Sequence, residues 1–334
     1  MKHQYVDRTS GCIATEKLFG DRIVSFLYSG VRENAPLLFQ LITQQRVSHL
    51  LAKANFDLPL GPSLLGNRRF LRSCGVNLNE CVAPPHELRT PRRIFERQIR
   101  YWEHRPMPDE PGAVVCPADA RVVIGSLESG KLLFVKNKFF QYDELLGCKK
   151  AWREAFVDGD VAIFRLTPDK YHYTHTPVAG IIRDHYEVPG ELHSCNPGAV
   201  VELVTPYSKN RRAVTVFDTD AAGGTGVGLV AMIEVAALMI GEIVQCYSDH
   251  GYEKPRAVQR CMGVRKGAPK SLFRPGSSAV VVLFQKNRVE FARDLVVNLY
   301  RSDVESRFSY GFLQPLVETD VNVRSLLATR RKHP

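Results

Sequence analysis

The stretch Gly276-Ser277-Ser278-Ala279-Val280-Val281-Val282-Leu283-Phe284 decides how this chain is interpreted. Its apolar run, 279–284, is typical of a buried strand. Ser277 follows a glycine at the start of that strand, and such a hydroxyl can attack the peptide bond that precedes it. Glycine permits this because it tolerates strained dihedral angles and leaves its carbonyl open. A polar turn that leads into a strand explains the same residues, so the choice depends on the rest of the chain.

The composition is that of an ordinary globular protein. Of 334 residues, 44% are apolar and 9% aromatic, and the length suggests about two domains. The net charge of +10 favours anionic partners, such as nucleic acid, an acidic membrane or an anionic ligand. Eight cysteines without a C-x-x-C pair indicate reduced thiols in a cytoplasmic protein, rather than a zinc site or a disulfide framework.

No targeting or membrane-spanning segment is expected. The first residues, MKHQYVDRTSGC, lack the apolar core of a signal peptide. The longest apolar stretch, 227–244, contains Glu234 and Glu242, which argues against a membrane span. Any contact with a membrane is therefore expected to be peripheral.

Residues 13–60 are predicted to form amphipathic helices. Their apolar stripe is either a core face or the side of a helix that rests on a membrane surface. The first part of the stripe consists of Leu18, Phe19, Ile23, Phe26 and Leu27.

Residues 61–112 are rich in arginine, and a helix is predicted from Pro91 to Trp102. The arginines suit either an anionic surface or a solvated face with ion pairs to Glu96 and Glu103. No helix-turn-helix, zinc finger or aromatic-basic RNA motif is visible, so nucleic acid is not an expected partner. The arginines are Arg68, Arg69, Arg72, Arg89, Arg92, Arg93, Arg97, Arg100 and Arg105.

From about Val114 the pattern changes to short apolar runs between Gly, Pro and Asp turns, which predicts a mostly β domain. The fold class is therefore α+β, with a helical, arginine-rich region at 1–112 and the β domain at 113–334. The run 227–244 suits either a buried helix or paired strands, and the chain after Glu305 looks irregular, with a frayed basic end. The strand runs are 121–124, 132–135, 161–166, 180–186, 200–204, 212–217 and 279–284.

Two closely spaced histidines, His172 and His175, follow a predicted strand and are braced by prolines. The proton of a histidine moves near neutral pH, which suits general acid or base catalysis. A metal site with His185, His193 or Asp169 is an alternative. Purely structural histidines are another.

Asp119 stands at a turn between two apolar runs. It either bonds local backbone or orients a histidine as the third member of a relay of Asp119, His175 and Ser277.

A glycine cluster at 223–228 has neither the G-x-G-x-x-G spacing nor a Gly-Lys-Ser/Thr ending, so a nucleotide site is not expected. Gly226 and Gly228 remain candidates for close backbone approach to a substrate or an oxyanion.

In this order, the segments resemble the phosphatidylserine decarboxylases, which are self-cleaving, pyruvoyl-dependent proenzymes. The resemblance covers about residues 90–290, and the N-terminal helices match only loosely. The matching pieces are Arg105-Pro106, Pro117-Ala118-Asp119, Lys136 with Tyr142 to Gly147, Tyr171-His172 with His175-Thr176-Pro177, Val188-Pro189-Gly190, Gly226-Val227-Gly228 and Gly276-Ser277-Ser278.

The resemblance implies that Ser277, activated by His175 with Asp119 behind it, attacks the carbonyl of Gly276 and converts the amide to an ester. Elimination then yields a β chain, 1–276, and an α chain, 277–334, which stay together as a heterodimer. Ser277 becomes a covalent pyruvoyl group, and neither an external cofactor nor a metal is implied.

The resemblance also implies that the pyruvoyl ketone forms a Schiff base with phosphatidylserine and accepts electrons as CO2 leaves, which gives phosphatidylethanolamine. His172 would serve as the acid or base of decarboxylation, and His175 would act in self-cleavage. The N-terminal helices would rest on an anionic membrane at its cytoplasmic side. Assembly into a homo-oligomer stays open.

Three departures from the family pattern, Ala120, Asn137 and Pro275, remove no reactive group but loosen the inference to a lipid substrate. A pyruvoyl decarboxylase of a soluble amino acid is therefore one alternative. An uncut, non-enzymatic protein that binds anionic lipid is another. A zinc metallohydrolase is a third.

Overall fold

The computed structural model describes residues 2–16, 75–128, 139–202, 206–237, 242–276 and 278–332. Several sequence predictions lie outside these residues: the helices over 17–60, Arg68, Arg69 and Arg72, the strand at 132–135, and Ser277 itself.

Strands dominate the described residues, which confirms the α+β class. The strands are β1 (Gln4–Asp7), β2 (Ile13–Thr15), β3 (Ala113–Val115), β4 (Ala120–Ser126), β5 (Asp160–Leu166), β6 (Tyr173–His175), β7 (Gly180–Val188), β8 (Arg212–Asp218), β9 (Leu229–Ala236), β10 (Ile243–Gln245), β11 (Gly263–Val264), β12 (Pro269–Phe273), β13 (Ser278–Phe284), β14 (Val289–Phe291), β15 (Glu318–Val321) and β16 (Leu326–Arg330).

The helices are short. They are the 3-10 helices η2 (Leu78–Glu80) and η3 (Pro85–Glu87) and the α-helices α6 (Pro91–Phe95), α7 (Tyr101–His104), α8 (Tyr142–Leu145), α9 (Lys150–Ala155), α10 (Pro197–Glu202), α11 (Pro206–Lys209), α12 (Arg293–Leu299) and α13 (Arg307–Phe312). None of the described helices is long and apolar enough to cross a membrane.

A ten-stranded sheet in the order β11-β7-β8-β9-β13-β5-β4-β15-β1-β2 forms the body of the molecule. Strand β13 lies near its centre, antiparallel to both β5 and β9. All seven residues of β13 are buried, because its continuous apolar run is covered on both faces. The predicted strand 279–284 is therefore confirmed as the centre of the core.

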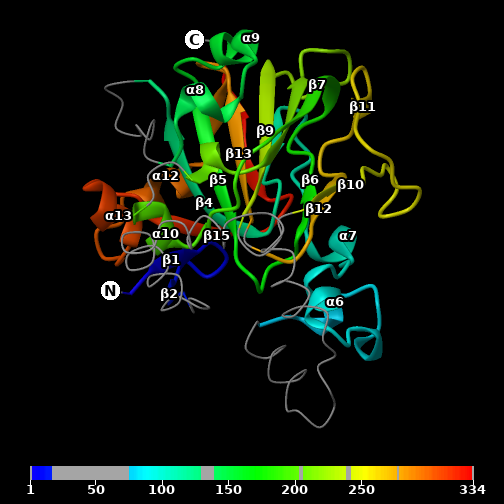
Figure 1. Ribbon diagram of the computed structural model, residues 1–334, viewed down its shortest axis with the longest axis vertical. Helices are drawn as coiled ribbons and strands as arrows, with labels where there is room; N and C mark the ends of the chain where they lie inside the picture. The colour runs from blue at the N-terminus through cyan, green and yellow to red at the C-terminus, as the bar shows by residue number, and fades with distance from the viewer. Residues whose placement is uncertain are drawn as a thin grey trace.

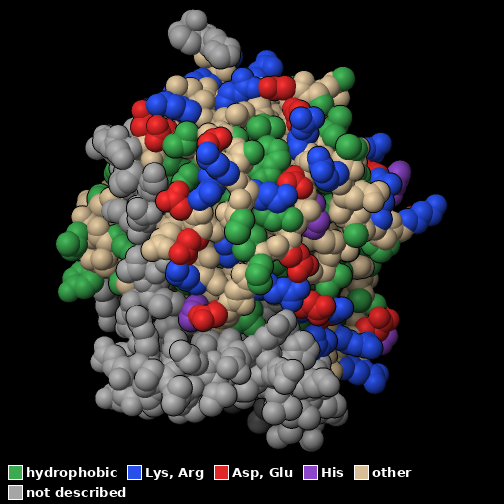
Figure 2. Space-filling view, turned by 45° about the horizontal axis from the view of Figure 1, so that its top comes forward, with side chains coloured by type: hydrophobic (Ala, Val, Ile, Leu, Met, Phe, Trp, Pro, Cys, Tyr) green, Lys and Arg blue, Asp and Glu red, His purple; other side chains and the backbone are tan. Residues whose placement is uncertain are grey.

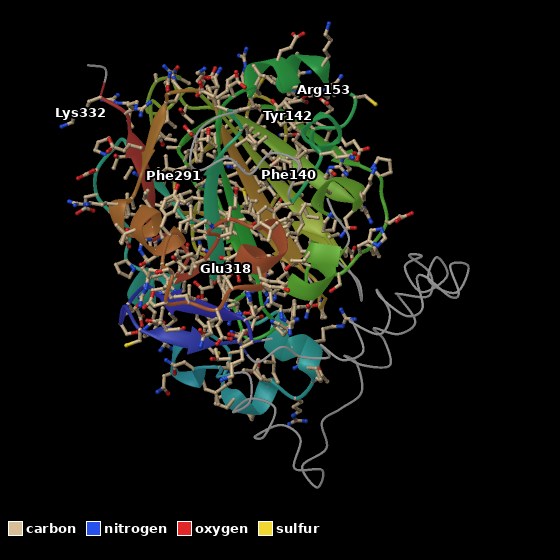
Figure 3. The ribbon with its side chains drawn as sticks, turned by 90° about the vertical axis from the view of Figure 1, so that its left-hand side faces the viewer. Phe140, Tyr142, Arg153, Phe291, Glu318 and Lys332 are labelled. Atoms are coloured by element: carbon tan, nitrogen blue, oxygen red, sulfur yellow. The ribbon has the colours of Figure 1, made fainter. Side chains whose placement is uncertain are left out.

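Two three-stranded sheets, β10-β12-β6 and β14-β16-β3, complete the fold. In Figure 1, β6, β10 and β12 lie on the right of the large sheet, and α10, α12 and α13 lie on its left. Figure 3 shows Phe140 and Phe291 inside the body, with Tyr142 and Arg153 toward the end that carries α9 and Glu318 toward the opposite end.

Some sequence predictions are corrected. Of the predicted strand 200–204, residues 200–202 belong instead to α10, and the other two lie outside the described residues. The helix starts at Asn196-Pro197, where the Asn196 side chain accepts from the Gly198 N–H at 2.9 Å. The predicted helix 91–102 is two helices, since Ile99 between them bridges to Cys81. Ile13–Thr15 form β2 rather than the start of a helix.

The chain after Glu305 is ordered rather than irregular. It forms α13, β15 and β16, and β15 pairs with both β1 and β4 in the large sheet. This pairing was hidden from the sequence because the partners lie about 200 to 300 residues away in the chain. The ambiguous run 227–244 contains β9 and the first two residues of β10, so the strand alternative is correct for its described residues.

Candidate active site

One edge of the large sheet collects most of the residues that the sequence singled out. Ser278, the first residue of β13, lies opposite Leu166 at the end of β5 and Ala236 at the end of β9. Strand β4 pairs antiparallel with β5, so its beginning, with Asp119 just before it, lies at the same edge. Strand β6, which carries His175, belongs to the small sheet beside it.

The predicted cleavage point lies in the connection from the small sheet to the large one. Only residues 274–277 separate β12 from β13. Gly276 has φ of 148°, a backbone conformation that residues with a side chain rarely adopt. This backbone conformation explains why a glycine stands before the candidate nucleophile. Ser277 itself lies outside the described residues.

The chain before Gly276 is held from both sides. The N–H of Phe273 donates to the His172 carbonyl at 3.0 Å, and the N–H of Arg274 donates to the Glu242 carbonyl at 2.9 Å. The Arg274 guanidinium also pairs with Glu96 at 2.6 Å. These contacts anchor one side of the connection, while the pairing of Ser278 with two strands anchors the other.

Ser278 adds a second hydroxyl to this site. It is buried, and its Oγ has no hydrogen-bond partner among the described residues. A buried polar atom without a partner costs free energy and calls for an explanation. The sequence shows Ser278 only as part of the motif, because burial and hydrogen-bond partners are not visible in a sequence.

His172 is buried with one ring nitrogen engaged and the other free. Its Nδ1 lies 2.8 Å from the Lys170 carbonyl, so Nδ1 carries the hydrogen. Its Nε2 has no partner in the described part of the chain, and its ring stacks on Phe95 with centroids 3.5 Å apart. Burial, together with the positive charge of Arg97, holds the pKa of His172 well below its ordinary value. The ring is neutral and offers a lone pair.

His175 is also buried, but both of its nitrogens are engaged. Nδ1 donates to the Gly267 carbonyl at 2.9 Å, and Nε2 lies 3.0 Å from the Tyr171 hydroxyl. The ring packs edge-on against Tyr101 at 4.7 Å. Mainly because of burial, the pKa of His175 falls to about 3. Within the described ranges the two histidines share no side-chain partner, as expected for residues three apart on an extended chain.

Asp119 pairs with an arginine rather than with a histidine. Arg105 donates to both carboxylate oxygens, at 3.0 and 2.8 Å, and the Val323 N–H donates at 2.7 Å. Burial alone would raise the pKa of Asp119, but the hydrogen bonds and charge of Arg105 hold it below its ordinary value. No hydrogen bond among the described residues joins Asp119 to His175, although the aspartate charge acts on the imidazole.

Gly226 and Gly228 are not brought to this edge. They form the turn before β9, and Gly228 precedes the end of β9 that lies opposite Phe284, whereas Ser278 lies opposite the other end. The seven-residue offset amounts to roughly 23 Å at the usual rise of a strand. Their N–H groups are also occupied, by the Thr219 carbonyl and the Asp220 carboxylate.

A buried ion pair next to the site was missed by sequence reasoning. Lys270 of β12 donates to Glu234 of β9 at 2.6 Å, and both side chains are fully buried. Thr174, between the two histidines, donates to the same carboxylate at 2.7 Å, and Ser271 also bonds it. In the sequence, the sign of this pair is Glu234, a glutamate within an apolar run. A glutamate there also argues against a membrane span, which is the only meaning that the sequence alone gives it.

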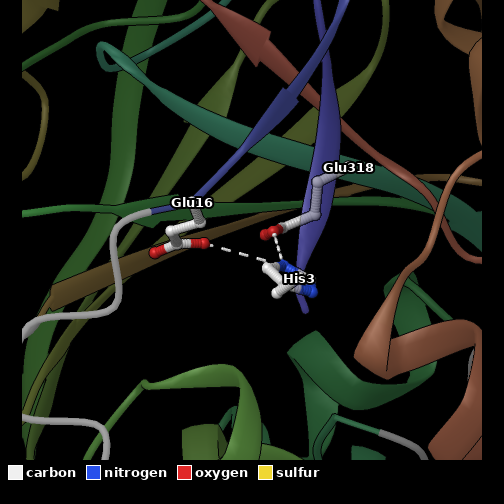
Figure 4. A group of neighbouring side chains, drawn as sticks. All are labelled: His3, Glu16 and Glu318. Carbon is white, nitrogen blue, oxygen red and sulfur yellow. Dashed lines mark hydrogen bonds and ion pairs between the residues drawn. The ribbon is translucent and has the colours of Figure 1, made fainter. Parts of the chain in front are cut away.

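The histidines named in the metal alternative make other contacts in the described part of the chain. His185 Nδ1 lies 3.0 Å from the Thr215 hydroxyl, and His193 pairs with Glu191. Among the described residues, the ligand-type side chains that do converge are His3, Glu16 and Glu318, shown in Figure 4.

The cluster of Figure 4 is an ion-pair network. Arg165 donates to both Glu16 and Glu318 at 2.6 Å, and Arg121 also pairs with Glu16. His3 lies 2.6 Å from Glu318. Because two arginines occupy the carboxylates, the network ties the N-terminal hairpin to β5 and β15 rather than offering oxygens to a cation.

Two of the described arginines of 75–112 make local ion pairs, whereas Arg97 donates to the Asp169 carbonyl and Arg105 pairs with Asp119. Arg92 pairs with Glu96 at 3.2 Å and Arg100 with Glu103 at 2.9 Å, as one of the two sequence alternatives required. In Figure 2, basic and acidic side chains are interspersed over the face that is shown. The other alternative, an anionic surface bound by this region, stays a prediction.

Comparison with known proteins places the chain among enzymes of one kind. The family model described as phosphatidylserine decarboxylase matches residues 92–302. A phosphatidylserine decarboxylase proenzyme of Bordetella petrii is 33% identical over 67% of this chain and 78% of its own length. One of Chlamydia trachomatis is 29% identical over 87% of this chain and 90% of its own. Phosphatidylserine decarboxylase proenzyme 2 of Oryza sativa is 31% identical over 71% of this chain and 35% of its own length.

Proposed function

The chain belongs to the phosphatidylserine decarboxylase family, and from that premise we propose that it is a proenzyme that cuts itself between Gly276 and Ser277. As a member of this family it is a carboxy-lyase, which converts phosphatidylserine to phosphatidylethanolamine. The cut would give a β chain, 1–276, and an α chain, 277–334. The two would stay associated, because β13 begins the α chain and pairs with β5 and β9 of the β chain.

The observation that carries the proposal is the connection at Gly276. It crosses between two sheets, is anchored on both sides, and has a φ of 148° at the residue whose carbonyl would be attacked. The hydroxyl of Ser277 would attack that carbonyl, with His175 taking its proton and Asp119 supporting the charge of the ring. The proton would pass to the amide nitrogen as the C–N bond breaks.

The described side chains fit the pyruvoyl group that such a cut would leave at position 277. The Nε2 of His172 and the Oγ of Ser278, which have no partner among the described residues, are buried polar atoms at this edge. The group would supply a ketone that binds the substrate amine and accepts electrons from the departing carboxylate. Neutral His172 would hold and return a proton at Nε2, and its stacking on Phe95 would exclude water.

The cut is tested by the intact mass of the purified protein. We expect two chains divided between positions 276 and 277, the second with a pyruvoyl-blocked N-terminus. Ser277→Ala should remain one chain of about 37.6 kDa. Ser278→Ala is the matched control, because it removes the neighbouring hydroxyl and should still be cut. A cut Ser277→Ala, or an uncut wild-type chain, would refute the proposal.

The substrate and its location are part of the same proposal. We expect CO2 release from phosphatidylserine in vesicles, with the region 1–112 resting on the anionic membrane at its cytoplasmic side. Vesicle flotation and CO2 release with vesicles or with free amino acids would distinguish this from a decarboxylase of a soluble amino acid. Turnover of a free amino acid without vesicle binding would favour that alternative.

A further inference from the structure

A chain of hydroxyls leads away from His175. The Tyr171 hydroxyl lies 3.0 Å from Nε2 of His175 and 2.7 Å from the hydroxyl of Tyr252. Tyr252 donates to the Ile99 carbonyl at 2.8 Å and accepts from the Ile99 N–H at 3.2 Å. Tyr252 lies in the loop between β10 and β11, 81 residues from Tyr171, so only the tertiary structure assembles this chain.

The number of hydrogens available for hydrogen bonding decides whether this series of hydroxyls suits the neutral or the protonated form of His175. Three contacts, from Nε2 to Tyr171, from Tyr171 to Tyr252 and from Tyr252 to the Ile99 carbonyl, share the two tyrosine hydrogens when the ring is neutral. Nδ1 cannot help, because its hydrogen is directed at the Gly267 carbonyl. With neutral His175, one of the three contacts therefore lacks a hydrogen.

A protonated ring completes the set. Nε2–H then donates to Tyr171, Tyr171 donates to Tyr252, and Tyr252 donates to the Ile99 carbonyl, so every contact has one donor and one acceptor. Burial raises the pKa of both Tyr171 and Tyr252, so both hydroxyls keep their hydrogens at neutral pH. The chain is thus complementary to a charge that the resting ring lacks, which is the arrangement that lowers a barrier.

We propose that Tyr171 and Tyr252 are positioning residues that stabilise the protonated ring of His175 while the Gly276–Ser277 bond is cut. This rests on the proposed role of His175 as the base of self-cleavage. Tyr171 first turns its hydrogen from Nε2 to Tyr252, which leaves the lone pair of Nε2 to take the proton of the attacking hydroxyl. That proton moves to the amide nitrogen when the C–N bond breaks, and Tyr171 turns back, so no proton is gained or lost.

Other groups around His175 act in both directions. Arg324 and Arg105 oppose a positive ring, and the charge of Asp119 favours it. Tyr101 packs against the imidazole with the two ring planes nearly perpendicular. Asp119 is itself paired with Arg105, so the hydroxyl chain is the contact that bonds directly to the nitrogen that gains the proton.

The test measures self-cleavage of freshly translated full-length chain over time. We expect Tyr171→Phe and Tyr252→Phe each to slow the cut by roughly 10- to 100-fold, because the first removes the hydrogen bond to the charged ring and the second leaves the Tyr171 hydroxyl without an acceptor when the ring is charged. Tyr252 is the sharper probe, because it does not bond to His175. Tyr173→Phe is the matched control: its ring stacks on Tyr171 and its hydroxyl bonds Gln98, so the wild-type rate should persist.

A spectroscopic measurement separates positioning from packing. In the Ser277→Ala proenzyme, the 15N resonance of His175 Nε2 should shift in Tyr252→Phe, because the Tyr171 hydrogen is then committed to Nε2. An unshifted resonance with wild-type cleavage in Tyr252→Phe would overturn the inference. Slow cleavage with an unshifted resonance would also overturn it, by indicating a packing effect. Cleavage of Ser277→Ala itself would instead overturn the proposed function.

Discussion

At the scale of single residues, the two histidines differ in which nitrogen is available. Nε2 of His172 is buried and has no partner in the part of the chain that the structure describes, whereas both nitrogens of His175 are bonded. Neither ring is charged at neutral pH, because burial lowers the pKa of each. This contrast gives a physical reason for assigning them different steps.

We expect His172→Gln to be cut normally but to release CO2 about 100-fold more slowly, the usual contribution of a general acid or base. Gel analysis of the chains and CO2 release from phosphatidylserine vesicles measure the two steps separately. His185→Gln is the control, since His185 bonds Thr215 on the large sheet and should preserve both. An uncut His172→Gln chain would contradict this division of roles.

At the scale of elements, the Lys270–Glu234 pair fastens β12 to β9 just before the cleavage connection. Although burial raises the pKa of Glu234, the charge of Lys270 lowers it below its ordinary value, so the carboxylate stays ionised. Such a pair specifies geometry more than it adds stability, because both charges lose their hydration.

We expect Lys270→Met to lower the free energy of unfolding of the uncut Ser277→Ala protein by about 3 to 5 kcal/mol, because it leaves the buried carboxylate of Glu234 without its charged partner. The double variant Lys270→Met with Glu234→Met should recover most of this loss. Urea unfolding measures both. Lys150→Met, which breaks the exposed pair with Glu154 on α9, should cost less than about 0.5 kcal/mol. Equal losses in the single and double variants would disprove the coupling.

At the scale of the whole molecule, buried histidines make stability depend on pH. Burial lowers the pKa of His175 from 6.5 to about 3, and it also lowers the pKa of His172 and of His185. Below pH 6.5 the unfolded chain therefore binds protons that the folded chain does not. The free energy of unfolding consequently decreases as the pH is lowered. The carboxylates affect stability at lower pH. Burial would raise the pKa of Glu318, but Arg165 lowers it, so the contribution of Glu318 to stability is lost only below pH 4.5.

We expect the uncut Ser277→Ala protein to lose stability between pH 7 and pH 5, with about 2 kcal/mol of the loss due to His175 alone. His175→Gln in the same background should flatten the pH dependence by that amount. His86→Gln, at an exposed site, should leave it unchanged. The measurement is the urea midpoint against pH, and parallel curves for the parent and His175→Gln would refute the assignment.

The sequence by itself determined the reactive residue types and the centre of the fold. The apolar run 279–284, the glycine before Ser277 and the braced histidines are local patterns, and local patterns report burial and backbone freedom. Segments whose pairing is distant were missed, such as the strands after Glu305.

Only the tertiary structure decided which residues contact one another at the site. It paired Asp119 with Arg105, placed Gly226 and Gly228 at the far end of β9, and brought Tyr252 to Tyr171 beside His175. Hydrogen-bond partners depend on atoms within about 3 Å, and strands far apart in sequence set those distances through their register. A sequence names the groups that can react, but the register of the sheets decides which of their atoms are free.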